Sequence, residues 1–528
     1  MSFNSKGFRV VFVNLKTHMP CYFAGSRFTL EHIGIGYLSS FLRQHDYEVV
    51  IIDAATRDMS DDEVIREILD CAPSMIGFSP TVATMESAIR IGNRLKKTAE
   101  NVHICLGGHH ATFLAEQILR EEECIDSVVR GEGERTVLEL ADRLCSGSSL
   151  KGTLGLYFRN GVGGISKNPG RNKIKDLDSL PFPARDVLKW QVERGKSPTA
   201  RVIGSRGCIA NCSFCSIPRF ERLQRGQLWR ARSADNVLDE LTYLKEKFHI
   251  KTVLFAEDNF IGPGIAGRKR TEQIAEGILS RGLGIRFRIL CTSESLIACE
   301  SLLPLLKKAG LDRVIVGIES ASPNALKIFK KKTTVEQHYR LAGILAHHSI
   351  VLHLGFIMFN PYSSFDDLRL NAEFLGKINQ ACFFQYFSNR MELYPGVGIF
   401  RRLEKEKMIL SKSEYKRGFL YRYAEPCIEK LARGLSPIRR NRAELDRSLL
   451  DIDIRVSRNG NDDSKSDFIR GYSVLRKGLS ARNMEFFLSS VELAESGWSP
   501  DAFEELKDMY MNDTEKMADE LRSMLEVI

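Results

Sequence analysis

Short apolar runs alternate with amphipathic segments over about the first 150 residues of the chain. The runs with the length and composition of strands are Val10–Leu15, Val49–Asp53, Met75–Ser79, Val102–Leu106 and Ser127–Arg130. Between them, apolar positions recur at helical spacing in Ile33–Gln44, Asp61–Leu69, Thr84–Lys97 and Ala111–Arg120. Strands that alternate with helices of this length predict an α/β fold with a doubly wound parallel sheet, Rossmann-like or flavodoxin-like.

The same alternation resumes near residue 199, after a linker. Residues 146–175 are rich in Gly, Ser and Asn and predict a hairpin-bearing linker, and Pro181 and Pro183 keep the following passage extended. The next runs expected to be strands are Thr199–Gly204, Thr252–Glu257, Ile285–Cys291, Arg313–Ile318, Val351–Phe359 and Cys382–Leu393. A helical pattern follows each run, so the chain predicts a partial (βα)6 barrel of the TIM type, with its chemistry at the carboxyl ends of the strands.

The remaining residues, 411–528, show helical patterns and no strand period. A polar run, Ser457–Ser466, interrupts them and predicts a disordered loop. We expect a small, mostly helical C-terminal domain that closes over the barrel mouth, with packing alone as the alternative. The predicted domains are therefore 1–150, 151–197 (a linker), 198–410 and 411–528.

Composition adds limits on the class of protein. With 43% hydrophobic and 27% charged residues, no 18-residue apolar run and no signal-peptide pattern at the N-terminus, the chain predicts a soluble protein. Twelve cysteines in 528 residues suit the reducing cytoplasm better than a secreted scaffold. The net charge of +9 is spread along the chain, so we interpret Lys330–Lys332 and Arg439–Arg442 as solvated faces and expect no nucleic-acid partner.

Three cysteines follow the first strand of the second α/β region at fixed spacing. Cys208, Cys212 and Cys215 form a C-x3-C-x2-C pattern. A structural zinc site needs four ligands, and no second half of such a site follows. A four-iron cluster usually takes four thiolates, so three thiolates would bind three irons and leave the fourth open to an outside ligand. A zinc knuckle and plain buried thiols are the alternatives.

This cysteine pattern, with the aromatic Phe214 before its third member, resembles the signature of the radical S-adenosylmethionine (radical SAM) enzymes. The resemblance implies a [4Fe-4S] cluster whose open iron binds S-adenosylmethionine (SAM) and cleaves it to a 5′-deoxyadenosyl radical. It also implies that SAM is contacted by Phe214 and by residues at the strand ends, namely Glu257, Asp258, Asn259, Ser293, Gly317, Glu319, Ser320 and Phe356. For Asp258 and Glu319, a capping carboxylate is the alternative. No residue is assigned a catalytic role.

The strand ends of the first α/β region resemble the cobalamin-binding domain found before many radical SAM cores. Ser79-x-Thr81 and Gly107-Gly108 match two of that family's motifs, and Glu132 lies in the Gly-Glu-Gly segment after the fifth strand. The resemblance implies cobalamin contacts at these five residues, and tight turns or an empty domain are the alternatives. The family's Asp-x-His-x-x-Gly motif is missing, since residues 14–19 read Asn-Leu-Lys-Thr-His-Met, so no histidine is assigned to cobalt. His109 and His110 are expected to be turn residues.

The resemblance implies a cobalamin-dependent radical SAM enzyme that methylates an unactivated carbon of a small-molecule substrate. It also implies a flavodoxin- or ferredoxin-type electron donor. One alternative is a radical dehydratase, cyclase or rearrangement enzyme, because the family's Gly-x-Pro-Gly-x-Thr turn is replaced by Phe359–Ser364. The others are a tRNA methylthiotransferase, for whose second cluster only Cys21, Cys71 and Cys105 are candidates, and a cobalamin sensor without enzymatic activity.

Overall fold

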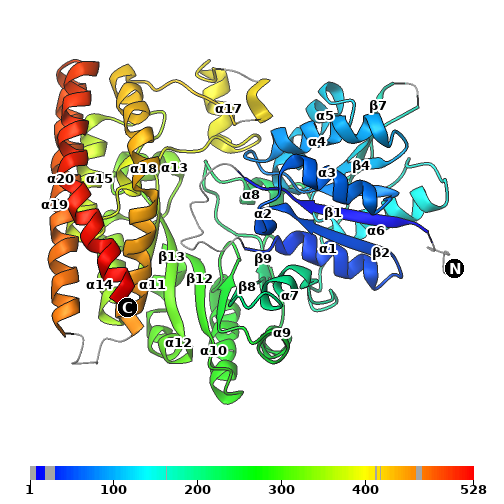
Figure 1. Ribbon diagram of the computed structural model, residues 1–528, viewed down its shortest axis with the longest axis horizontal. Coiled ribbons are helices and arrows are strands. Elements are labelled where there is room, and N and C mark those ends of the chain that lie inside the picture. Colours follow the sequence, from blue (N-terminus) through cyan, green and yellow to red (C-terminus); the bar gives the residue numbers. More distant parts are fainter. Residues whose placement is uncertain are drawn as a thin grey trace.

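The computed structural model describes residues 7–17, 30–161, 163–410, 413–416, 418–458 and 466–527. An N-terminal α/β region and a C-terminal helical bundle lie at opposite ends of the molecule, with a second α/β region between them (Figure 1). None of the described helices has the length and apolar composition that a membrane crossing requires.

The N-terminal sheet has seven strands in the order β2-β1-β3-β4-β5-β6-β7. Five are parallel and confirm the predicted strands to within one or two residues: β1 (Arg9–Asn14), β2 (Glu48–Asp53), β3 (Met75–Phe78), β4 (His103–Leu106) and β5 (Ser127–Val129). The predicted linker hairpin exists as β6 (Leu156–Arg159) and β7 (Ile165–Lys167), which extend this sheet in antiparallel fashion. The hairpin therefore belongs structurally to the N-terminal sheet.

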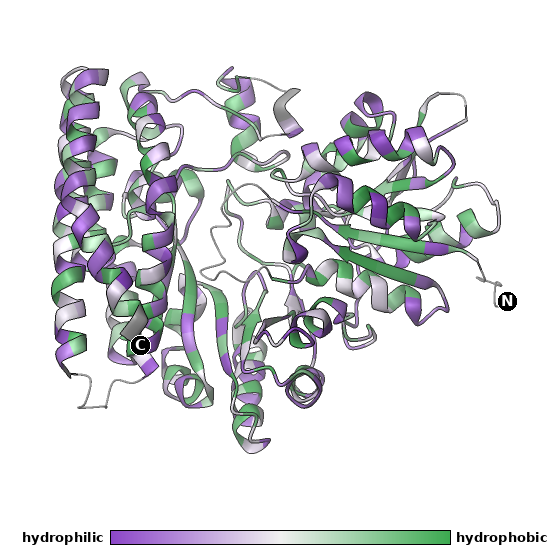
Figure 2. Ribbon diagram, in the orientation of Figure 1, coloured by the Kyte–Doolittle hydropathy of each residue, from purple (hydrophilic) through white to green (hydrophobic). Residues whose placement is uncertain are grey.

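Helices cover both faces of this sheet. Helices α1 (Ile33–Arg43) and α6 (Glu134–Cys145) share a core on one face, and α2 (Ala54–Arg57), α3 (Asp61–Asp70), α4 (Met85–Thr98) and α5 (Gly108–Glu121) belong to the other. Because both faces are buried, the strands are apolar almost throughout, as β1 and β2 show in Figure 2. The switch of faces between β1 and β3 marks the crevice where such sheets bind ligands.

A buried ion-paired arginine anchors the passage between the two sheets. Arg185 precedes α7 (Asp186–Val192), and its guanidinium pairs with Glu31 of the N-terminal region and with Glu240 of the next, at 2.5 Å from the latter. Both carboxylates and the guanidinium are almost completely buried. The pairs therefore fix the linker against both regions.

The central sheet has five parallel strands in the order β14-β13-β12-β11-β8. They are β8 (Thr199–Val202), β11 (Thr252–Phe255), β12 (Arg286–Thr292), β13 (Leu311–Glu319) and β14 (Val351–Phe356). A two-stranded ribbon, β9 (Ser205–Arg206) with β10 (Arg230–Ala231), follows β8. The helices of this region are α8 (Ile217–Glu221), α9 (Ala234–Phe248), α10 (Gly264–Ser280), α11 (Ser293–Ala298), the 3-10 helix η1 (Glu300–Leu302), α12 (Leu303–Ala309), α13 (Pro323–Phe329), α14 (Val335–His347) and α15 (Phe365–Lys377).

The predicted sixth strand, Cys382–Leu393, is wrong. This stretch contains the short helix α16 (Gln385–Ser388), and a single parallel bridge between Phe359 and Arg390 is its only pairing with the end of the sheet among the described residues. The Asp446 carboxylate accepts the backbone N–H groups of Phe384 and Gln385 at 3.0 and 2.8 Å and so favours a helix start there. The aromatic side chains of the run pack into the core of the C-terminal helices instead of a sheet.

The C-terminal region is helical, as predicted. After α17 (Gly398–Lys405) and the 3-10 helix η2 (Ser413–Lys416), three long helices form a bundle: α18 (Pro426–Arg458), α19 (Ser466–Ser496) and α20 (Pro500–Val527). In Figure 1 the bundle stands beside β13, and its residues share one hydrophobic core with the central region. Closure over the barrel mouth stays a prediction, and most of the predicted disordered loop, residues 459–465, lies outside the described residues.

Candidate functional site

The cysteine loop begins where β8 ends and is held in place from several sides. Both oxygens of the buried Glu257 are engaged at its start, by the Gly204 N–H at 2.8 Å and by the Ser205 hydroxyl. Gly207 has a φ of +86°, and a Cβ there would lie 2.1 Å from the Leu228 carbonyl oxygen. Only glycine therefore permits the turn that leads into Cys208.

The three cysteines share one partly buried space. Burial raises the pKa of Cys212 to about 11 and that of Cys215 to about 12, and each feels the charge of its neighbours in the motif. The Cys208 sulfur accepts the Ala210 N–H at 3.4 Å, a contact of the kind that sulfur ligands of clusters receive. Such thiols stay protonated near neutral pH unless a metal displaces the proton.

The number of these thiols suits a cluster that keeps one iron open. Each thiolate of a four-iron cluster binds a different iron, so Cys208, Cys212 and Cys215 would serve three irons. The residues present therefore fit a [4Fe-4S] cluster with one iron left open.

Lys331 lies in the same partly buried space as the three cysteines, a position that the sequence did not predict. Its ammonium donates to the Gly317 carbonyl at 2.8 Å. Although burial opposes the charge, Glu319, Cys212 and Glu294 raise the pKa of Lys331. The interpretation of Lys330–Lys332 as a solvated face is therefore wrong for its middle member, and nothing in a run of three lysines shows which one turns inward.

Two carboxylates at the ends of β11 and β13, the strands on either side of β12, carry raised pKa values. Burial raises the pKa of Glu319 to about 7, against the opposing effect of Lys331. Solvent reaches Asp258, but protein surrounds its carboxyl group on most sides. The resulting loss of hydration, together with the negative charge of Glu221, raises the pKa of Asp258 to about 7. The Asp258 carboxylate also accepts the Gly207 N–H at 3.2 Å. The structure thus brings both predicted carboxylates to the edge where the cysteines lie.

Gly317 permits the close approach of Glu319. A Cβ at Gly317 would lie 2.5 Å from a carboxylate oxygen of Glu319, and Glu319 itself has a left-handed backbone with a φ of +69°. Both features occur at the end of β13, where the pairing register with β14 shifts. The backbone is therefore bent locally so that Glu319 stands beside Lys331.

The other residues predicted to contact SAM have their side chains engaged within the protein. Asn259 donates to Ser295 at 2.9 Å, the Ser293 hydroxyl donates to the Gly317 carbonyl at 3.3 Å, and Ser320 donates to Asn371 at 2.8 Å. The ring of Phe356 is buried against Phe374, and Phe214 packs edge-on against Phe329. Like Glu257, these side chains shape the strand ends, and direct SAM contacts from them stay predictions.

In the N-terminal region, the ends of β3 and β4 come close together. Gly108 has a φ of +83°, and a Cβ there would lie 2.8 Å from the Ser79 hydroxyl. Thr81 helps to start α4, since its N–H donates to the Thr84 hydroxyl at 3.0 Å. Ser79, Gly107 and Gly108 therefore lie together at the carboxyl edge, next to the switch point of the sheet.

Glu132 belongs to a buried network between the two α/β regions. Its carboxylate contacts the guanidinium groups of Arg206 and Arg230 at 3.4 and 2.7 Å and accepts the Ile174 N–H at 2.7 Å. Glu134 also pairs with Arg206, at 2.6 Å. The geometry gives Glu132 a role in joining the regions, and a contact with cobalamin stays a prediction.

The histidines near this edge have local partners. The ring of His109 stacks on Phe220 of α8 with centroids 3.9 Å apart, and His110 is hydrogen-bonded to the Tyr415 carbonyl at 2.8 Å. Burial lowers the pKa of His109 to about 4. His18 and Met19, which stand in place of the missing histidine motif, lie outside the described residues.

Comparison with known proteins identifies two domain families in the chain. A model of the B12 binding domain matches residues 20–141, and a model of the radical SAM superfamily matches residues 202–375. An uncharacterized methyltransferase of Pyrococcus horikoshii is 34% identical over 66% of this chain and 73% of its own length. The anaerobic magnesium-protoporphyrin IX monomethyl ester cyclase of Rubrivivax gelatinosus is 30% identical over 61% of this chain, which covers 58% of that protein.

Solved structures show the same fold. The cobalamin-dependent SAM radical enzyme OxsB, with aqua-cobalamin and SAM bound, superimposes with a TM-score of 0.69 at 21% identity, covering 98% of this chain and 83% of that one. The radical SAM methyltransferase TsrM of Kitasatospora setae gives a TM-score of 0.62 at 14% identity, covering 92% and 99%. The chain therefore belongs to the radical SAM superfamily, in the group that carries a B12-binding domain ahead of the radical SAM domain, and its cofactors are a [4Fe-4S] cluster, SAM and cobalamin.

Proposed function

We propose that this enzyme transfers a methyl group to an unactivated carbon of a small molecule. The observation that carries the proposal is the joining of the two cofactor regions: the segment that bears the cysteine loop is ion-paired to the carboxyl edge of the B12-binding region through Arg206. The relative named a methyltransferase, at 34% identity, supports this reaction over the others that the family performs.

The cluster ligands are assigned to Cys208, Cys212 and Cys215. When bound, the cluster and SAM supply a 5′-deoxyadenosyl radical that abstracts hydrogen, and cobalamin supplies the methyl carrier. The three thiols give up their protons on metal binding, and the nearby Lys331 ammonium stabilises the resulting negative charge.

The polar groups around the cysteines suit the polar parts of SAM. The Lys331 ammonium suits the carboxylate of the methionine moiety, and Asp258 suits its amino group. Glu319 can accept hydrogen bonds from the ribose hydroxyls, which favour its ionised form. Glu257, Asn259, Ser293, Ser320 and Phe356 hold the strand ends on which these groups stand.

For cobalamin, we propose that Ser79, Thr81, Gly107 and Gly108 line the crevice at the carboxyl edge of the N-terminal sheet. Small residues there let a bulky ligand approach the backbone. The buried network through Glu132 fixes this edge relative to the cysteine loop, so the distance between the two cofactors is set by the fold.

A second candidate is a cyclase or synthase reaction on the same core. A relative at 30% identity is named a cyclase, and the 4′-phospho-dehydrooxetanocin synthase of Priestia megaterium is 28% identical over 65% of this chain. The replacement of the family's Gly-x-Pro-Gly-x-Thr turn by Phe359–Ser364, beside the end of β14, also supports this second candidate. A flavodoxin- or ferredoxin-type electron donor and a cytoplasmic location complete the proposal.

Methyl-labelled SAM distinguishes the two reactions. The reconstituted enzyme is incubated without oxygen with labelled SAM, a strong reductant, cobalamin and an extract of small molecules from the source cells. Label that appears in a carbon-bound methyl group, together with 5′-deoxyadenosine, supports methyl transfer. Formation of 5′-deoxyadenosine and a modified but unlabelled product would instead establish the second candidate.

A further inference from the structure

The middle of the cysteine loop is held between the ends of two helices. The Ser213 N–H donates to the Phe329 carbonyl at 3.0 Å, and the Ser213 hydroxyl donates to the Ile328 carbonyl at 2.7 Å, both in the last turn of α13. The Ser213 carbonyl accepts the Ile399 N–H at 2.9 Å, in the first turn of α17. Since Ser213 directly follows Cys212, each helix end is one hydrogen bond and a short stretch of backbone away from a predicted cluster ligand.

Three exposed cations stand beside these contacts. Lys327 and Lys330 flank the two carbonyls of α13 that bind Ser213, and Arg401 lies near the start of α17. None of the three side chains has a hydrogen bond or an ion pair among the described residues. We refer to Lys327, Lys330 and Arg401 as the basic patch.

Helix stability does not explain the basic patch as a whole. Residues 323–332 contain four lysines and no acidic residue, so the end of α13 is positively charged. A cation suits the last turn of a helix, where Lys327 stands, but the helix dipole opposes a cation near the start of a helix, where Arg401 stands. The patch therefore combines cations from two helix ends that share only their contact with the cysteine loop.

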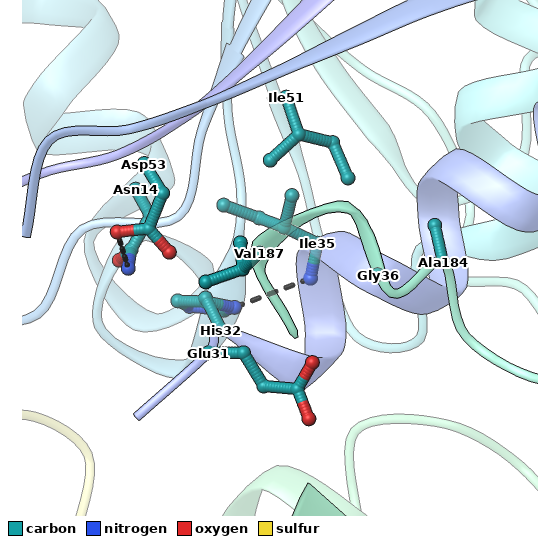
Figure 3. Close-up of a pocket in the computed structure, with 9 residues that line it drawn as sticks. All are labelled: Asn14, Glu31, His32, Ile35, Gly36, Ile51, Asp53, Ala184 and Val187. Atoms are coloured by element: carbon teal, nitrogen blue, oxygen red, sulfur yellow. Dashed lines mark hydrogen bonds between the residues drawn. The ribbon is translucent and has the colours of Figure 1, made fainter. Parts of the chain in front are cut away.

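Polar groups that serve the fold are bound by other groups of the fold. In the small pocket at the ends of β1 and β2, shown in Figure 3, the Asn14 amide donates to Asp53 at 3.1 Å and the His32 ring accepts the Ile35 N–H at 3.2 Å. The cations of the basic patch differ, because they are exposed and have no counter-charge among the described residues. They therefore suit an anionic partner from outside the chain.

The proposed function needs an electron at this place. Reductive cleavage of SAM consumes one electron from the cluster, which a donor must replace. In that step the donor is oxidised by one electron and the cluster is reduced by one, from the 2+ to the 1+ state, with no bond made or broken. Electron transfer slows steeply as the distance between two redox groups grows, so the donor must dock close to the cysteine loop.

We propose that the basic patch is the docking surface for the electron donor of this enzyme, a small redox protein with an acidic face around its own cofactor. The inference rests on the proposed function and adds the partner and the surface of the same cluster site. Carboxylates of the donor would face Lys327 and Lys330 on α13 and Arg401 on α17, which places the donor beside Ser213. Opposite charges across such a contact raise the rate of association, and salt weakens their effect.

Reversal of the three charges tests the proposal. In the variant that combines Lys327→Glu, Lys330→Glu and Arg401→Glu, reduction of the cluster by a purified bacterial flavodoxin in its hydroquinone form is followed by anaerobic stopped-flow absorbance. At an ionic strength of about 0.01 M, where the Debye length is about 30 Å, the rate constant should fall about tenfold or more from the wild-type value. At about 1 M, where the Debye length is about 3 Å, the two proteins should be reduced at similar rates.

The matched control is Lys308→Glu. Lys308 is an exposed lysine in the last turn of α12, as Lys327 is in α13, but it lies beside the amino end of β13, at the edge of the sheet opposite the cysteine loop. This variant should be reduced by the flavodoxin within about twofold of the wild-type rate at low ionic strength.

Reduction by dithionite separates the docking proposal from the proposed function. Dithionite needs no docking surface, so it should reduce the cluster of the wild type and of the variant to the same extent, as electron paramagnetic resonance shows. A wild type in which dithionite produces no cluster signal would contradict the proposed function itself. If dithionite reduces both proteins and the flavodoxin reduces them at equal rates at low ionic strength, the docking proposal is wrong.

The wild type alone provides a test if the variant does not take up a cluster. Its reduction by the flavodoxin should slow as the ionic strength rises from about 0.01 to 1 M, and a rate that does not fall overturns the proposal. Failure of both the flavodoxin and a reduced ferredoxin to reduce the wild type overturns it too. Equal flavodoxin rates, together with binding of single-stranded RNA by the wild type and not by the variant, would assign the basic patch to a nucleic acid instead.

Discussion

Removal of the Lys331 ammonium is expected to weaken SAM binding without loss of the cluster. The substitution Lys331→Met keeps an unbranched apolar stem and removes the charge that faces Glu319 and Cys212. A hydrogen bond to a charged group is worth about 1.5–3 kcal/mol, and about 1.4 kcal/mol corresponds to a factor of ten. We therefore expect the affinity for SAM to fall roughly 10- to 150-fold.

The assay is SAM binding to the anaerobically reconstituted, reduced enzyme, followed by the change in the electron paramagnetic resonance spectrum of the cluster. The iron content should remain about four per chain, because no thiol is changed. The matched control is Lys332→Met, the neighbouring exposed lysine, which should bind SAM like the wild type. Lys331→Arg, which retains the charge, should recover part of the lost affinity. Equal affinities for Lys331→Met and the wild type would refute the reasoning.

Three further outcomes follow from the geometry. Arg206→Gln breaks a buried ion pair and should lower the free energy of unfolding, measured with denaturant, by about 3–5 kcal/mol. Arg120→Gln, which breaks an exposed pair, should lower it by less than about 1 kcal/mol. Similar losses in the two variants would contradict the role of the buried network in joining the two α/β regions. Gly207→Ala forces a Cβ against a backbone carbonyl and should lower the iron content, unlike Gly282→Ala, where φ is also positive, at +57°, but the space around the new Cβ is open. Since the pKa of Glu319 is raised to about 7, its ionisation destabilises the fold as pH rises from about 4.5 through 7, so Glu319→Gln should raise the melting temperature more at pH 8 than at pH 5.

The parallel strands and the cysteine loop were predictable from the sequence because their signals are local. The strands β1 to β5 are buried on both faces, so each reads as an apolar run between turn residues. The run Cys382–Leu393 has the same apolar pattern, yet a helix begins within it. The Asp446 carboxylate, about 60 residues farther along the chain, accepts two backbone N–H groups of the run and favours this helix start. A contact between residues so far apart in the sequence cannot be predicted from the local pattern of apolar and polar residues.

The site was predictable in its residue types but not in its contacts. The carboxylates Asp258 and Glu319 are predicted from the resemblance of the strand ends to the family, but Lys331 is not, because its neighbours in sequence are also lysines. The same resemblance predicts a ligand contact for Glu132, whereas its ion pairs are with Arg206 and Arg230, which lie more than 70 positions away in the sequence. Burial and pairing of charges depend on the tertiary fold, which the one-dimensional pattern does not contain.

The most direct test of the account is the formation of 5′-deoxyadenosine by the reduced enzyme and SAM, measured by mass spectrometry. The wild type, with about four irons per chain, should form it, and the variants Cys208→Ala, Cys212→Ala and Cys215→Ala should each form none above background. Cys299→Ala, which removes a buried thiol outside the loop, is the matched control and should retain the activity. If any of the three loop variants forms 5′-deoxyadenosine at the wild-type rate, the assignment of the cluster to this loop is wrong.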